Sequence, residues 1–292
     1  MKTFSQHLTE EQELQQYSEI LLEKLITFGG KAYPKFGNVV IMAGGAGSGK
    51  GFVLSNLVGL EGKVMDVDEL KTAAAKSPLI RKRVKDETGM DIEAIASDLK
   101  NPENVGKLHD IIANVLQLDT RQKKVLMRGI LGAAPDRKPN LVFDTTLKDL
   151  QKLGNLSRML TNVGYEKKNI HIVWVVNDIE VAKAQNLTRS RTVPAEILVN
   201  THRGASQTMA DIVNMGKTLK RYMDGDIVFA FNKVGVDADL KVSGGGGSFL
   251  QDAKYFYAKR AGKPPTPVAS LDKDIKAKIS KYVPKAVTWS GR

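Results

Sequence analysis

The chain has 292 residues, of which 42% are hydrophobic and none is cysteine. A chain of this size can bury a large core without covalent staples, so we expect one large domain or one domain with appendages. The lack of cysteine excludes disulfides, zinc–thiolate sites and thiol nucleophiles. Lys and Arg outnumber Asp and Glu by 44 to 32, and the resulting net charge of +12 favours a polyanionic partner.

The N-terminal segment has neither the apolar stretch of a signal peptide nor a membrane span, so we expect a cytoplasmic protein without membrane contact. Apolar residues recur every three to four positions between residues 9 and 28. This spacing indicates an amphipathic helix. We expect residues 1–36 to pack on the core through that helix.

An apolar run at residues 38–43 leads into the glycine-rich stretch AGGAGSGKGF. A strand followed by G-x-x-x-x-G-K and a helix is typical of a phosphate-binding loop, in which backbone N–H groups and a lysine bind the phosphates of a nucleotide. The residues that we expect to contact ATP are Gly44, Gly45, Ala46, Gly47, Ser48, Gly49, Lys50 and Gly51.

The loop departs from its common form at one place. Gly51 and Phe52 stand where a Ser or Thr hydroxyl usually holds Mg²⁺. We therefore expect phosphate oxygens, water and acidic side chains to hold the metal.

Two acidic residues follow in KVMDVDELK, which we interpret as a second strand. Asp66 and Asp68 would face the same side of that strand, at the edge where open α/β sheets bind ligands. One could accept the proton of a substrate hydroxyl, and Asp66 could orient the substrate or hold the metal through water. Capping of the next helix is the alternative role.

A third strand, at residues 140–146, ends in Asp144 and is followed by two threonines. We expect Asp144 and Thr146 to contact the substrate, with helix capping as the alternative for the acid. Further strands are predicted at residues 169–177 and 224–232. Because helical patterns separate these strands, the chain is predicted to form an α/β fold with a parallel sheet and right-handed crossovers.

Two regions between the strands have a distinct character. Residues 69–131 are mostly helical in pattern and predict a helical insertion or a cap over the substrate. Residues 185–204 predict a lid, in which Arg189 and Arg191 precede a proline that can begin a helix. We expect these arginines to stabilise a transferring phosphoryl group, with ordinary surface arginines on a helix as the alternative. We assign no role to His202, because a lone histidine is more often structural.

Residues 233–292 carry 12 Lys and Arg against 5 Asp and Glu and contain the stretches SGGGGSF and KPPTP. This composition predicts a basic, loop-rich C-terminal extension beyond a core at residues 37–232. In it, Tyr255, Phe256 and Tyr257 adjoin positive charges. They would either stack on single-stranded nucleic acid or pack the extension on the core.

The order of these motifs resembles the zeta-toxin and polynucleotide-kinase-like group of P-loop kinases over roughly residues 38–232. The resemblance implies that Lys50 binds ATP phosphates, that Asp68 is the base acting on the acceptor hydroxyl and that Asp144 lies near the substrate. It also implies that Arg191 contacts phosphate. Arg189 is the nearest candidate for a second lid arginine, while Gln185 and Asn186 are other positions where one could stand.

The predicted function is therefore transfer of the γ-phosphoryl group of ATP, with Mg²⁺, to a hydroxyl group. The net charge favours a nucleic-acid acceptor, DNA before RNA, and we favour a hydroxymethylated pyrimidine base, as in related phage kinases. A 5′-hydroxyl polynucleotide kinase and a zeta-toxin-like UDP-N-acetylglucosamine kinase are the alternatives. A P-loop NTPase switch and a nucleic-acid-binding protein without phosphotransfer remain open.

Overall fold

The computed structural model describes most of the chain, and all structural statements below concern its described residues. These are residues 27–28, 31–32, 37–58, 62–134, 137–189, 191–231, 238–242, 248–253, 255–283 and 289. In these segments no helix is both long and apolar enough to cross a membrane.

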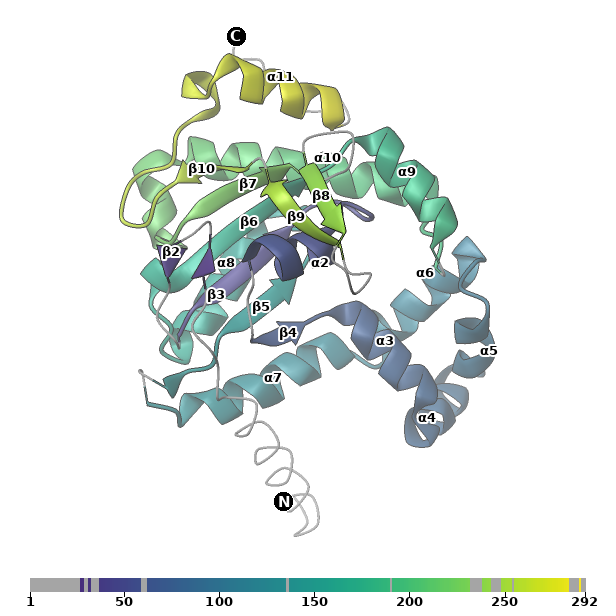
Figure 1. Cartoon of the computed structure of the whole chain (residues 1–292). Helices are drawn as coiled ribbons and strands as arrows, with labels where there is room; N and C mark the ends of the chain where they lie inside the picture. The colour runs from purple at the N-terminus through teal and green to yellow at the C-terminus, as the bar shows by residue number, and fades with distance from the viewer. Residues whose placement is uncertain are drawn as a thin grey trace.

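A six-stranded sheet forms the centre of the molecule, in the order β10-β7-β6-β3-β5-β4 (Figure 1). Five strands are parallel: β3 (Val39–Ala43), β4 (Lys63–Met65), β5 (Leu141–Asp144), β6 (Ile170–Val176) and β7 (Ile227–Phe231). The sixth, β10 (Tyr255–Lys259), pairs antiparallel with β7 at the edge. The α/β fold expected from the sequence is confirmed, with a mixed rather than a purely parallel sheet.

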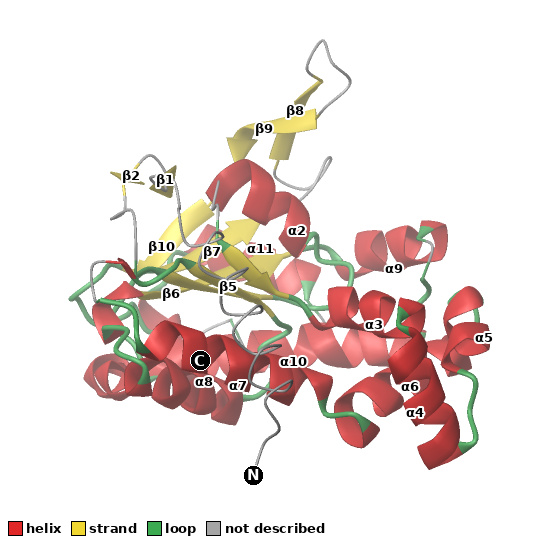
Figure 2. Ribbon diagram, turned by 90° about the horizontal axis from the view of Figure 1, so that it is seen from below, coloured by secondary structure: helices red, strands yellow, loops and turns green. Residues whose placement is uncertain are grey.

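Both faces of the sheet are buried, because successive residues of a strand point to opposite sides. In β3, Val39 and Ile41 belong to one hydrophobic cluster and Val40 and Met42 to another. Helices α7 (Leu118–Leu131), α8 (Leu150–Asn162) and α10 (Ala195–Asn214) cover the first face, and α2 (Lys50–Val53) with the π-helical η1 (Leu54–Val58) covers the second (Figure 2).

The predicted helical insertion is confirmed. It contains α3 (Val67–Lys76), α4 (Pro78–Thr88), α5 (Ile92–Ser97), α6 (Pro102–Asp110) and the π-helical η2 (Ile111–Val115), and it continues into α7. A hydrophobic cluster of its own, with Val84, Leu108 and Ile112 fully or almost fully buried, holds these helices together. The helices α3–α6 lie beside the edge at which the parallel strands end (Figure 1).

The remaining helical elements connect and flank the strands. Short 3₁₀ turns occur at η4 (Lys167–Asn169), η5 (Gly216–Arg221) and η6 (Val268–Ser270). Helix α9 (Ile179–Thr188) follows β6, and α11 (Lys273–Tyr282) lies in the C-terminal extension.

The C-terminal extension corrects the expectation of a loop-rich tail. It forms a hairpin of β8 (Ala238–Val242) and β9 (Ser248–Ala253), the sheet strand β10, and α11. The Phe256 ring packs edge-on against Phe229, with 4.9 Å between ring centroids. Buried Lys259 donates to a carboxylate oxygen of Asp224 at 2.9 Å. The aromatic stretch therefore packs the extension on the core, at least through Phe256.

Two expectations about the ends of elements also change. The predicted N-terminal helix lies outside the described residues, except for its last two, which form the strand β1 (Thr27–Phe28) paired with β2 (Lys31–Ala32). The predicted strand in KVMDVDELK stops at Met65, and helix α3 begins at Val67. Asp66 thus lies in the connection and Asp68 in the first turn of α3, so the argument that they share one side of a strand is wrong.

Candidate active site

Three neighbouring strands bring the candidate residues to one edge of the sheet. The register aligns Met42 of β3 with Asp144 of β5, and Ala43 of β3 with Trp174 of β6. Because these strands are parallel, the glycine-rich loop after β3 begins beside the carboxylate that ends β5. This is the strand–loop–helix context that a phosphate-binding loop requires, and α2 begins at Lys50 itself.

The loop needs its glycines for its backbone shape. Gly44, Gly47 and Gly49 have φ angles of 143°, 73° and 84°, which lie in the region that residues with a Cβ rarely adopt. Asn177, which follows β6, donates from its side-chain amide to the Gly47 carbonyl at 3.4 Å. The turn is thus held from β6 as well as by its own sequence.

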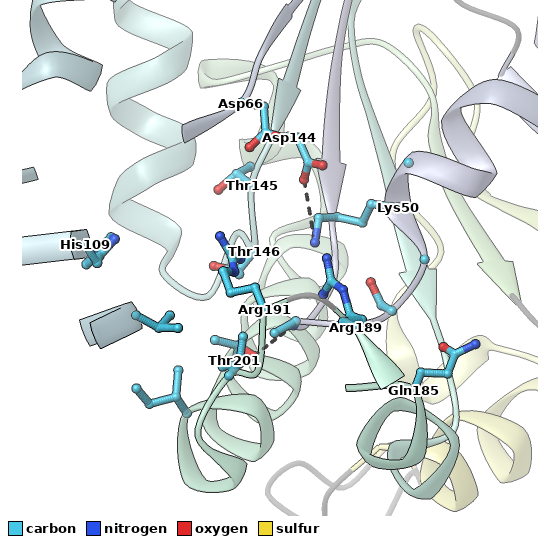
Figure 3. Close-up of a pocket in the computed structure, with 18 of the residues that line it drawn as sticks. Lys50, Asp66, His109, Asp144, Thr145, Thr146, Gln185, Arg189, Arg191 and Thr201 are labelled. Carbon is cyan, nitrogen blue, oxygen red and sulfur yellow. Dashed lines mark hydrogen bonds and ion pairs between the residues drawn. The ribbon is translucent and has the colours of Figure 1, made fainter. Parts of the chain in front are cut away.

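Lys50 lies across the loop and faces Asp144. Its Nζ donates to the carbonyls of Gly44 at 3.2 Å and Gly45 at 3.4 Å, and lies 3.6 Å from a carboxylate oxygen of Asp144 (Figure 3). The lysine and the acid are both largely buried. A positive and a negative side chain are therefore held together where the phosphates of a nucleotide would bind.

A cavity of about 920 Å³ opens over the loop. This volume lies within the usual range for small-molecule and cofactor sites. Its charged lining among the described residues is mainly cationic, with two carboxylates, Asp66 and Asp144, against six cations: Lys50, Lys71, Lys148, Lys152, Arg189 and Arg191. The arrangement suits a ligand with several negative charges.

Arg189 and Arg191 line this cavity on the side opposite Asp66 (Figure 3). Figure 3 shows Arg189 and Arg191 on the side of the cavity away from Asp66, with Gln185 beyond them on α9. Asn186 is not available as a ligand, because it is buried and binds the backbone of Val193 twice, accepting from its N–H at 2.9 Å and donating to its carbonyl at 2.7 Å. These two hydrogen bonds close the loop that carries the arginines.

The helical insertion contacts both the lid and the cavity. The Thr192 N–H donates to the Leu99 carbonyl at 3.0 Å, and Lys100 donates to the Leu187 carbonyl at 3.4 Å. Val105 and His109 of α6 line the cavity. The insertion is thus part of the cavity wall.

The residues fit a magnesium ion that is held largely by its nucleotide. Mg²⁺ usually takes one or two protein carboxylates and fills its other positions with phosphate oxygens and water. Asp66 and Asp144 offer two carboxylates on one cavity, and no cluster of three or more His, Cys, Asp or Glu occurs among the described residues. Asp144 is the acid beside Lys50, which makes it a second candidate next to Asp66.

Most of the predicted site residues meet at this cavity. They include Ala46 to Gly51, Asp66, Asp144, Thr146, Arg189 and Arg191, while Gly44 and Gly45 form the start of the loop. Asp68 lies one turn before the cavity-lining Lys71 on α3, and its side chain lies outside the described residues.

Sequence reasoning missed one pair of residues on α10. The Ala46 N–H donates to Thr201 Oγ1 at 3.0 Å, and His202 Nε2 donates to the Ala46 carbonyl at 2.8 Å. Burial lowers the pKa of His202 to about 4; the hydrogen bond to Ala46 opposes that shift, and the charge of Lys50 adds to it. Both residues lie over 150 positions from the loop, so their spacing carries no signal that a motif search could use.

Comparisons with known proteins found a matching family and several similar solved structures. Residues 113–231 match the Zeta toxin family, a segment that contains Asp144 and both lid arginines and begins after the glycine-rich loop. A structure from the PezAT toxin–antitoxin system of Streptococcus pneumoniae is 14% identical, with 78% of this chain and 77% of that chain covered and a TM-score of 0.37. The AvrRxo1-ORF1:AvrRxo1-ORF2 complex with ATP is 13% identical, with coverages of 97% and 86% and a TM-score of 0.42. No curated protein matches the chain.

Proposed function

We propose that this zeta-toxin-like P-loop kinase transfers the γ-phosphoryl group of ATP to a hydroxyl group of a nucleic-acid acceptor. One observation carries the proposal. Lys50 and Asp144 at the sheet edge and Arg189 and Arg191 of the lid line the same cavity, although the sequence places them up to 141 positions apart. Phosphoryl transfer depends mainly on positioning and on charge around the transferring group, and this cavity provides both.

Each residue has a defined part in the transfer. Backbone N–H groups of the loop and the N-terminus of α2 bind the phosphates of ATP. Lys50 exchanges its loop carbonyls for phosphate oxygens, as a mobile charge on a flexible side chain can. Arg189 and Arg191 face the γ-phosphate and stabilise the charge on its oxygens in the transition state.

The acceptor hydroxyl needs a base, and Asp68 remains our candidate. A carboxylate that receives the hydroxyl proton leaves the oxygen free to bond to phosphorus, while the bond from phosphorus to the leaving oxygen of ADP breaks. Asp66 or Asp144 would hold Mg²⁺ through water, and the ion would neutralise charge on the phosphates.

The acceptor side of the cavity supports an anionic substrate. Lys148 and Lys152 line it beyond the loop, His109 and Lys71 line it from the insertion, and the whole chain has a net charge of +12. Nucleic acids supply primary alcohols next to phosphodiesters. We place a hydroxymethylated pyrimidine of DNA first and a 5′-hydroxyl end second.

A second candidate follows from the family match over residues 113–231. The resemblance to zeta toxins implies a nucleotide sugar, UDP-N-acetylglucosamine, whose diphosphate would suit the same cationic wall. The acceptor experiment distinguishes this candidate from the first.

The experiment follows label from [γ-³²P]ATP. The protein is incubated with hydroxymethylated DNA, the same DNA without hydroxymethyl groups, a 5′-hydroxyl oligonucleotide and UDP-N-acetylglucosamine. We expect label on nucleic acid, and label that needs hydroxymethylation supports the first choice. Label on the nucleotide sugar alone contradicts a nucleic-acid acceptor, and label on inorganic phosphate alone contradicts the kinase reaction.

A further inference from the structure

Helix α10 holds the phosphate loop through two hydrogen bonds to one residue, Ala46. Thr201 accepts from the Ala46 N–H at 3.0 Å, and His202 donates to the Ala46 carbonyl at 2.8 Å. Both side chains are almost fully buried, with exposed fractions of 8% for Thr201 and 3% for His202. The two peptide bonds on either side of Ala46 are therefore fixed in direction by one helix.

This fixing has a consequence for the next N–H group of the loop. The Ala46 carbonyl and the Gly47 N–H belong to the same peptide plane, and the described residues contain no cis peptide bond. In a trans peptide the C=O and the N–H point in opposite directions. Because His202 holds the carbonyl towards α10, the Gly47 N–H points away from α10. Ala46 and Gly47 both line the cavity.

We propose that Thr201 and His202 are positioning residues that aim the Gly47 N–H at a phosphate of the nucleotide. The proposal rests on the proposed function, in that the phosphate belongs to ATP. The two residues do not touch the nucleotide through this contact; they act through the direction of the loop backbone. A backbone donor that is fixed in advance loses no free energy to reorientation when the phosphate binds.

Gly45 shows how closely the loop and the helix fit. A Cβ at this position would lie 2.0 Å from Cδ2 and 2.3 Å from Cγ of the His202 ring. The histidine ring therefore occupies the space of a side chain at position 45. Loop and helix are complementary in shape as well as in hydrogen bonding, which favours a specific role over an incidental contact.

The same helix also begins at the lid. Pro194, three residues after Arg191, is the N-cap of α10, and Thr201 and His202 lie two turns further along. The phosphate loop and the arginine lid are thus anchored on one rigid element. Movement of α10 would shift both together.

Equilibrium binding of ATP and of inorganic tripolyphosphate tests the proposal without any transfer reaction. The variant His202→Leu replaces the imidazole with an apolar side chain of similar size that donates no hydrogen bond. We expect this variant to bind both ligands at least about tenfold more weakly, because the Gly47 N–H is no longer held in the direction of the charged phosphate. His202→Gln carries an N–H donor and is expected to restore most of the affinity. The acceptor KM should stay the same in both variants.

A second pair of variants covers the case in which His202→Leu does not fold, as judged by circular dichroism. Thr201→Val has nearly the shape of threonine but cannot accept the Ala46 N–H, while Thr201→Ser can. We expect weaker binding of both ligands for valine and little change for serine. A folded His202→Leu or Thr201→Val variant with unchanged affinity for tripolyphosphate overturns the positioning role. An unmodified protein that binds neither ligand contradicts the proposed function instead.

Discussion

The residue that distinguishes this loop is Gly51. It stands where related loops carry a metal-binding hydroxyl, and an ideal Cβ built on it meets nothing within 4 Å. Its backbone is helical and its position is exposed. Neither the space around position 51 nor its backbone conformation therefore excludes a serine or a threonine there.

We predict that Gly51→Ser folds, binds ATP and needs less Mg²⁺ for half-maximal transfer. The serine hydroxyl would add an oxygen ligand of the kind Mg²⁺ prefers. Replacing a glycine in a helix also favours folding by roughly 0.5 kcal/mol. Rates measured over a Mg²⁺ titration test the prediction, with Gly51→Ala as the control for helix propensity. An equal Mg²⁺ requirement in both variants would show that position 51 does not face the metal.

A second prediction concerns Asp68. If the Asp68 carboxylate takes the proton of the acceptor hydroxyl, Asp68→Asn should lower kcat by about 10²- to 10⁴-fold while the Kd for ATP changes little. The exposed Asp86 on α4 gives the matched control, Asp86→Asn. Asp66→Asn should act mainly through the Mg²⁺ requirement. Transfer that persists in Asp68→Asn would move the base to Asp66 or Asp144.

A third prediction uses the buried His202. Its pKa is about 4 in the folded protein against 6.5 in the unfolded chain, so the unfolded chain binds the proton first as the pH falls. Because of this residue, the free energy of unfolding should fall by roughly 2–3 kcal/mol between pH 7 and pH 4.5. The loss begins near pH 6.5 and ends below pH 4.

Denaturant unfolding of the unmodified protein and of His202→Gln checks this sign. Glutamine does not titrate, so the free energy of unfolding of the His202→Gln variant should fall less over the same pH range. The difference between the two proteins removes the contribution of carboxylates that titrate in both. Parallel pH profiles would mean that His202 takes up its proton without unfolding of its site.

At the scale of elements, the C-terminal extension completes the core. Trp289 is fully buried, stacks on Trp174 with 5.2 Å between ring centroids and donates its indole N–H to Ser206 Oγ at 2.7 Å. Ser206 lies one turn beyond His202 on α10. The extension therefore packs on the helix that binds Ala46 of the glycine-rich loop.

We predict that Trp289→Ala lowers the free energy of unfolding by about 3–5 kcal/mol, because a buried aromatic side chain leaves a cavity. Trp289→Phe should lower the free energy of unfolding by less, because it keeps an aromatic ring in the core. The remaining loss should come partly from the Ser206 hydroxyl, which no longer accepts the indole N–H. Urea unfolding followed by circular dichroism gives the values, and Ser206→Ala measures the hydrogen bond separately. A loss below about 1 kcal/mol for Trp289→Ala would show that the C-terminal contact adds little to the fold.

At the scale of the whole molecule, the charge of +12 bears on the acceptor. Binding of DNA should weaken linearly in log Kd with log salt, with a slope near 0.9 per phosphate contacted. Filter binding at several salt concentrations measures the slope. Exposed lysines of α11 allow a test of the extension: Lys273→Ala with Lys281→Ala should reduce the slope if α11 contacts DNA. Salt-independent binding would contradict the charge argument.

Local patterns were enough for much of this protein. The five parallel strands, the glycine-rich loop and the helices between residues 67 and 131 each follow from residues that are close together in the chain, because period, capping and glycine content act locally. The common edge of the site followed too, since carboxyl ends of parallel strands must meet. The α/β fold with its largely parallel sheet could thus be predicted before any contact was known.

Tertiary structure alone decided the contacts between distant residues. The place of Asp68 in a helix depended on where a short strand stopped, which the sequence KVMDVDELK leaves ambiguous. The antiparallel β10, the pair of tryptophans and the hold of Thr201 and His202 on Ala46 join residues that are far apart in the chain. No periodicity or spacing encodes such pairs, because they exist only once the sheet and α10 have packed.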